Sequence, residues 1–142
     1  LIQFCQTLTN SICPIEIETK LKTSYLVNNI CVVGNSLYNY VIAIVVPNPK
    51  ALHKMAKMVL KSGVDSETAY TSPNVRHKML AKLTAFAKSN GLRRYEIPRE
   101  LILVKDDWTP ESGLVTASFK LKRKNIEQHY GDSIREAFSK LD

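Results

Sequence analysis

The residues best suited to chemistry form a basic segment in the last third of the chain. Two hydroxyl side chains, Thr116 and Ser118, lead into it. The segment then holds four cations within five positions: Lys120, Lys122, Arg123 and Lys124. A lysine ammonium on a loop before a helix reaches outward as a mobile point charge that suits phosphate. The segment therefore predicts contact with an anionic ligand.

A basic helix start without any ligand is the simpler alternative. Spacing alone favours this alternative, because most charge runs are solvated surface. However, a helix N-terminus prefers acidic residues, so cations placed there cost stability. Such a local departure from the usual rule is mild evidence of a functional demand.

Other catalytic signatures are absent from the sequence. It contains no GxGxxG, no phosphate-binding GxxxxGK loop, no HExxH and no GxSxG. His53, His77 and His129 are scattered over predicted helices, where we expect surface or hydrogen-bonded side chains. The acidic residues do not cluster, so we predict no metal site.

Length and composition predict one globular domain. The chain has 142 residues, of which 44% are hydrophobic and 23% charged. Its net charge of +7 favours nucleic acid, acidic membranes or phosphorylated small molecules, without choosing among them. The odd number of cysteines (Cys5, Cys13 and Cys31) and the lack of CxxC spacing favour a reducing compartment. Cys31 lies in an apolar run and is predicted to be a core residue.

The N-terminal half predicts a helix followed by two strands. The helix covers residues 15–24, with Ile15 and Leu21 on its apolar side and the charged residues Glu16, Glu18, Lys20 and Lys22 opposite. Strands are predicted over residues 29–34 and 40–46, joined by a hairpin loop at Gly34, Asn35, Ser36 and Asn39. The second strand is a continuous apolar run, so both of its faces should be buried.

The rest of the chain alternates helices with loops around one more strand. We predict a helix over 51–61, a loop over 62–72 and a second helix from Pro73 to a stop at Asn90 and Gly91. A connector over 92–98 then leads to a strand over 101–104. A loop over 106–113, a turn-rich segment over 114–123 and a helix over 124–141 complete the chain. Gly131 is a candidate interruption of the last helix. The predicted fold class is α+β, a small β-sheet with packed helices.

The basic segment resembles the last core motif of the adenylate-forming superfamily of acyl-CoA synthetases, luciferases and peptide-synthetase adenylation domains. That motif reads roughly Pro-x-Thr-x-Ser-Gly-Lys-x-x-Arg, and the residues in register are Thr116, Ser118, Lys120 and Arg123. A Tyr-x-x-Pro connector before a strand also belongs to the pattern, and residues 95–98 match it.

A closer resemblance links the chain to the eukaryotic long-chain fatty-acyl-CoA synthetases. The sequence segments that carry this resemblance are residues 108–115, 119–124 and 129–130. The resemblance covers residues 15–142 and implies the C-terminal lid domain of such an enzyme. Residues 1–14 do not match the family's hinge and stay unassigned. Phe119 stands where the superfamily has glycine, so the loop cannot rely on glycine's free backbone.

The resemblance implies two half-reactions. A fatty acid first attacks ATP to give acyl-adenylate and pyrophosphate, and the thiol of CoA then displaces AMP. Lys120 is the implied catalytic residue, because its ammonium would screen the approach of two anions and stabilise charge on the phosphoryl oxygens. Thr116, Ser118 and Arg123 are expected to bind cofactor, with a structural anchor as the open alternative for Arg123.

The implied partners are the fatty acid and a large N-terminal ATP-binding domain of the same enzyme. That domain should hold most of the ATP, CoA and Mg²⁺ contacts, so the chain alone should be inactive. We expect no nucleic acid partner and no transmembrane segment here. The parent enzyme should be intracellular, at the endoplasmic reticulum or mitochondrial outer membrane.

A basic nucleic-acid- or partner-binding module without catalysis is the rival interpretation. Its basic residues would need interleaved aromatic rings as a stacking platform, and the sequence does not provide them. A salt titration with generic DNA would separate the two interpretations.

Overall fold

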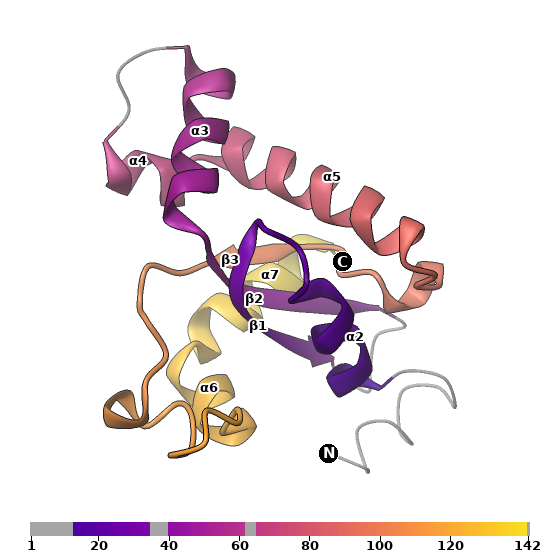
Figure 1. Ribbon diagram of the computed structural model, residues 1–142, viewed down its shortest axis with the longest axis vertical. Coiled ribbons are helices and arrows are strands. Elements are labelled where there is room, and N and C mark those ends of the chain that lie inside the picture. Colours follow the sequence, from indigo (N-terminus) through magenta and orange to yellow (C-terminus); the bar gives the residue numbers. More distant parts are fainter. Residues whose placement is uncertain (1–12, 35–39, 62–64, 142) are drawn as a thin grey trace.

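A three-stranded sheet forms the centre of the computed structural model, which describes residues 13–34, 40–61 and 65–141 (Figure 1). β1 (Val27–Gly34) pairs antiparallel with β2 (Val41–Pro47), and β3 (Leu101–Leu103) pairs parallel with β2. The order β1-β2-β3 leaves β1 at an edge. Every residue of β2 is buried, as its unbroken apolar run predicts.

Four helices cover one face of the sheet: α2 (Pro14–Leu21), α3 (Pro49–Leu60), α4 (Ser66–Thr71) and α5 (Pro73–Ser89). Their apolar sides meet Val41, Ala43 and Val45 of β2 in a first core. α3 and α5 each begin with proline after a capping residue, Asn48 or Ser72, whose side chain accepts backbone N–H groups.

The opposite face is covered by α6 (Arg123–His129), α7 (Gly131–Leu141) and the loop that holds Trp108. These segments meet the alternate residues of β2, Ile42, Ile44 and Val46, in a second core. In Figure 1, α3, α4 and α5 lie above the strands and α6 lies below them. The fold is therefore a sheet between two helical layers, which confirms the predicted α+β class.

Most predicted elements are present, with two differences. The predicted loop over 62–72 is wrong, because part of it forms α4. Asp65 caps this helix by accepting the N–H of Thr68 at 2.8 Å, and Ala69 is buried in the first core. One capped turn with one buried residue is too short to show a clear hydrophobic period. The predicted last helix is divided into α6 and α7 beside Gly131, the candidate interruption.

Some predictions fall on residues that the structure does not describe. The predicted hairpin-loop residues Asn35, Ser36 and Asn39 lie outside the described residues, as do residues 1–12 of the unassigned segment. No helix in the described ranges has the length and apolar character that a membrane crossing requires.

The buried centre of the sheet generates a stability prediction. We expect Ile44→Ala to lower the free energy of unfolding by about 2 to 5 kcal/mol, because it leaves a cavity at a fully buried position. Urea unfolding of the chain measures this loss. Met58→Ala is the matched control, since Met58 is 59% exposed on α3 and should change the value by only about 0.5 kcal/mol. Similar effects at both positions would contradict the two-core arrangement.

Candidate functional site

The predicted catalytic lysine lies on a tight turn formed by residues 116–120. Thr116 N–H donates to the Lys120 carbonyl at 2.8 Å, and Phe119 N–H donates to the Thr116 carbonyl at 2.8 Å. Thr116 Oγ1 accepts the N–H of Lys120 at 3.1 Å and shares a hydrogen bond of 3.1 Å with Ser118 Oγ. The two hydroxyl residues thus shape the turn that presents Lys120, whose side chain is exposed.

Phe119 occupies an unfavourable position in this turn. Its φ of 62° lies in the left-handed region, which costs a residue with a Cβ atom about 1 to 2 kcal/mol. Glycine would adopt this conformation freely, so the turn forms here despite the lack of glycine's freedom. The phenylalanine ring is also 61% exposed.

Arg123, three residues after Lys120, forms a bidentate ion pair with Glu18 of α2. Nη1 donates to Oε2 at 2.8 Å and Nη2 donates to Oε1 at 2.7 Å. Glu18 Oε2 also accepts the N–H of Val32 at 2.6 Å, and Arg123 Nη1 donates to the Val32 carbonyl at 3.2 Å. The pair therefore satisfies a peptide group at the edge strand β1 and connects the helical layers on both faces of the sheet.

These contacts favour the structural alternative for Arg123, and its contact with CoA stays a prediction. Burial by itself would lower the pKa of Arg123, but the hydrogen bond and charge of Glu18 raise it above the ordinary arginine value. The guanidinium thus stays charged inside the fold. The cation at the first position of α6 has a specific partner, which explains part of the unusual charge at this helix start.

A hollow of about 470 Å³ lies between the turn and α2. Ile15 and Thr19 line it from α2, Lys22 lines it from just after that helix, and Phe119 and Lys120 line it from the turn. Much of the lining is apolar, and two ammonium groups lie at the same hollow. An anion held by Lys120 would therefore have an apolar surface next to it.

Three side chains hold the loop that leads to the turn. Trp108 Nε1 donates to Tyr130 Oη at 3.1 Å, and Tyr130 Oη donates to Asp106 Oδ2 at 3.1 Å. Burial raises the pKa of Tyr130 to about 12, so the hydroxyl keeps its proton at neutral pH. Trp108 and Tyr130 belong to the sequence segments that carry the family resemblance, and they fix the loop against the junction between α6 and α7.

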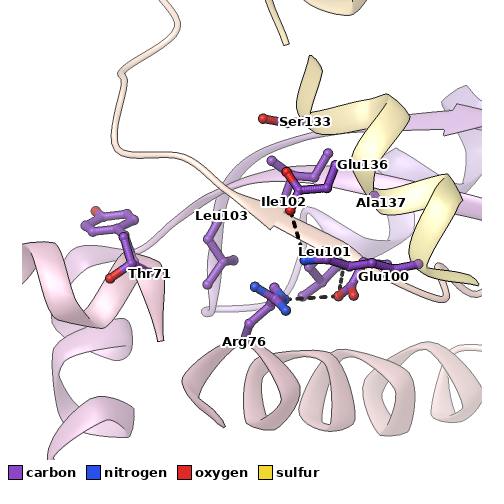
Figure 2. A pocket seen from close by; sticks show the side chains of 11 residues that line it. Thr71, Arg76, Glu100, Leu101, Ile102, Leu103, Ser133, Glu136 and Ala137 are labelled. Carbon is purple, nitrogen blue, oxygen red and sulfur yellow. Dashed lines mark hydrogen bonds and ion pairs between the residues drawn. The ribbon is translucent and has the colours of Figure 1, made fainter. Parts of the chain in front are cut away.

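A second hollow, of about 230 Å³, lies between α4, α5, β3 and α7 (Figure 2). Figure 2 shows Arg76 reaching from α5 to Glu100, with Nε and Oε1 separated by 3.2 Å. Glu100 Oε1 also accepts the N–H of Leu101 at 3.0 Å, and Lys140 pairs with Glu136 on the same rim. Because these charges are already paired, we assign this hollow no ligand.

Sequence reasoning placed two residues of α2 incorrectly. Ile15, predicted on the apolar side, is 47% exposed, whereas Glu18 is buried. The buried side consists of Pro14, Ile17, Glu18 and Leu21. This is the helical spacing i, i+3, i+4, i+7, and it contains one carboxylate. A carboxylate among the apolar positions of a helix is the sequence feature that could have indicated a buried ion pair.

No metal site is formed by the described residues, since no group of three or more His, Cys, Asp or Glu side chains gathers there. The structure does bring together the four residues matched to the motif, Thr116, Ser118, Lys120 and Arg123, within the turn and the start of α6. Among the described residues that line the 470 Å³ hollow from the turn side, Lys120 is the exposed cation.

No family model matches the chain. It is 33% identical over 125 residues to long chain acyl-CoA synthetase 8 of Arabidopsis thaliana, covering 87% of this chain and 17% of that protein. It is 34% identical over 113 residues to long-chain-fatty-acid–CoA ligase 3 of Saccharomyces cerevisiae, covering 78% of this chain and 16% of that protein. The chain thus spans less than a fifth of these relatives.

A solved structure matches the fold as well as the sequence. It is the A domain of carboxylic acid reductase from Segniliparus rugosus, in complex with AMP and a co-purified carboxylic acid. The TM-score is 0.75 at 29% identity, and the match covers 92% of this chain and 18% of that one. The sheet and its two helical layers therefore also form one part of a larger adenylate-binding protein.

The Glu18–Arg123 pair generates a prediction about stability. We expect Arg123→Ala to lower the free energy of unfolding by about 3 to 5 kcal/mol, because it leaves a buried carboxylate without its partner. Urea unfolding of the chain measures the change. The double variant Glu18→Gln with Arg123→Met should lose less than Arg123→Ala alone.

An exposed ion pair supplies the matched control. Arg135 pairs with Asp132 at the surface of α7, so Arg135→Ala should cost less than about 1 kcal/mol. If Arg123→Ala were as mild as Arg135→Ala, the pair would not hold the two layers together.

Cys31 generates a prediction about pH. Burial raises the pKa of the Cys31 thiol from 9.0 to about 12. The negative charge of Glu18 also raises this pKa, and the positive charge of Arg123 lowers it in part. The unfolded chain therefore releases this proton at lower pH than the folded chain. The thiol's contribution to stability is complete below pH 9 and falls as the pH rises towards 12. Between pH 9 and 12, the free energy of unfolding should fall less steeply with pH in Cys31→Ala than in wild type. Equal slopes in the two proteins would contradict the raised thiol pKa.

Proposed function

The chain belongs to the adenylate-forming enzymes related to long-chain acyl-CoA synthetases. From this we propose that it is the C-terminal lid domain of a long-chain fatty acid–CoA ligase. In this role it brings Lys120 to a reaction centre formed by a large ATP-binding domain. The support is the match to a small part of several such ligases, together with the motif register of Thr116, Ser118, Lys120 and Arg123.

One observation carries the proposal: Lys120 is an exposed cation on a turn that is fixed at both ends. Val115 and Leu121 pair across the base of the turn, and Thr116 closes it through backbone and hydroxyl hydrogen bonds. Arg123 then attaches the following helix to α2. The ammonium is therefore free to reach a ligand while its backbone keeps a defined position.

The chemistry that this cation serves is the first half-reaction. A carboxylate oxygen of the fatty acid forms a bond to the α-phosphorus of ATP, and the bond to pyrophosphate breaks. Both reactants are anions, so an ammonium between them reduces their repulsion and stabilises the charge that builds on the phosphoryl oxygens. In the second half-reaction the CoA sulfur attacks the acyl carbon, and AMP leaves.

The large domain is the proposed partner for most of the ligands. We assign ATP, CoA and Mg²⁺ mainly to it, and the described residues of this chain offer Mg²⁺ no cluster of carboxylate ligands. Thr116 and Ser118 contribute by shaping the turn, and any direct contact with cofactor stays a prediction. The location of the parent enzyme at the endoplasmic reticulum or mitochondrial outer membrane also stays a prediction.

The decisive test removes the ammonium in the complete enzyme, meaning this chain together with the large domain. We expect Lys120→Ala to slow acyl-adenylate formation by about a hundred- to a thousand-fold, the usual cost of losing one preorganised charge contact. ATP–pyrophosphate exchange measures this step. Thioester formation from supplied acyl-adenylate should be largely retained.

Two controls accompany this test. Lys124→Ala removes an exposed cation four residues away and should leave both half-reactions near the wild-type rate. The isolated chain with ATP, fatty acid and CoA should form no product. An equal loss of both half-reactions in Lys120→Ala would refute the assigned role.

A further inference from the structure

Phe119 is unfavourable for the domain in two independent ways. Its backbone has a left-handed φ of 62°, which glycine alone adopts without cost. Its side chain is 61% exposed, whereas Phe138 is buried in the second core and Phe86 packs partly buried against the first. Strained and exposed residues of this kind occur where the surrounding structure or a partner gives them a use.

The position of Phe119 links it to the cation. It precedes Lys120 on the same hydrogen-bonded turn, and both residues line the hollow beside α2. Ile15, which is 47% exposed, lines the same hollow from α2. An exposed ring and an exposed aliphatic side chain therefore flank the ammonium group.

We propose that Phe119, together with Ile15, is the apolar contact through which this domain docks on the large domain of the same enzyme when Lys120 enters the reaction centre. This inference rests on the proposed function. Whatever body Lys120 reaches must also approach Phe119, because the two residues are neighbours on one rigid turn. The ligand for Lys120 lies outside this chain, and the relatives that it matches contain far more sequence than the matched part.

A second copy of this chain is a poorer occupant for the same surface. The chain carries a net charge of +7, so two copies repel each other, and Lys22 and Lys120 add local repulsion at the hollow. The proposed docking requires an apolar pocket on the large domain beside bound anions, which would complement both the ring and the ammonium. Docking would bury the ring that the free domain leaves in water.

The test exchanges Phe119 for glycine, which removes the ring and also relieves the backbone. In the complete enzyme we expect Phe119→Gly to slow acyl-adenylate formation by about tenfold, the size that burial of one such side chain supports. Thioester formation from supplied acyl-adenylate should not change. The isolated chain should unfold at the same urea concentration as wild type or a higher one, since the strain is gone.

Further variants separate the ring from general surface effects. Phe119→Leu keeps an apolar contact and should lose less than Phe119→Gly. Ile15→Ala should change acyl-adenylate formation in the same direction, and Met58→Ala, an exposed apolar residue on α3, should have no effect.

The outcomes distinguish this proposal from the proposed function. If Lys120→Ala leaves adenylation intact, the proposed function fails and the docking contact fails with it. If Lys120→Ala abolishes adenylation but Phe119→Gly keeps the wild-type rate, only the docking contact is overturned. A loss in Phe119→Gly that affects both half-reactions equally, or that depends on acyl-chain length, also overturns it, because the ring would then serve another purpose.

Discussion

The ion pair between Glu18 and Arg123 is the interaction on which the arrangement of this domain depends. An edge strand leaves a row of N–H and C=O groups without partners, and this is a liability for a small sheet. The Glu18 carboxylate accepts the N–H of Val32, and the Arg123 guanidinium donates to the Val32 carbonyl. The pair therefore replaces part of a missing neighbouring strand. Since Glu18 lies in α2 and Arg123 begins α6, the same contact joins the helical layers across the edge of the sheet.

This contact also lies close to the turn that carries Lys120, the cation of the proposed function. Burying an ion pair removes two charges from water, and such a pair is tolerated only when further hydrogen bonds satisfy it. The peptide group of Val32 supplies those bonds, and the bidentate geometry fixes the orientation of the guanidinium. With Arg123 fixed, the turn three residues earlier has a fixed base. Burial next to this pair raises the pKa of the Cys31 thiol, the charge of Glu18 raises it further, and Arg123, whose Nη1 lies 3.8 Å from the Cys31 sulfur, partly offsets the rise.

The sequence was sufficient for features that depend on local patterns. The apolar run of β2 predicted a central buried strand, and the period of α5 predicted its helix. The site at Thr116, Lys120 and Arg123 rests on the family resemblance and stays a prediction. Features that depend on distant partners were not accessible in this way. Glu18 and Arg123 are 105 positions apart, and each looks like an ordinary surface charge within its own segment. The left-handed backbone of Phe119 was equally hidden, because a phenylalanine normally argues against it.

The choice of cation at positions 120 and 123 follows from these different surroundings. A guanidinium is planar and always charged, and its fork matches a carboxylate through two parallel hydrogen bonds, which is what the buried site at Glu18 requires. An ammonium is a compact charge on a flexible stem, which suits a group that must leave a fixed turn and meet an anion elsewhere. Exchanging the two residue types would place an ammonium, which cannot form the two parallel hydrogen bonds, in the buried site. It would also place the larger, planar guanidinium on the turn. The motif thus combines an arginine that joins two layers of the domain with a lysine that, under the proposed function, acts outside it.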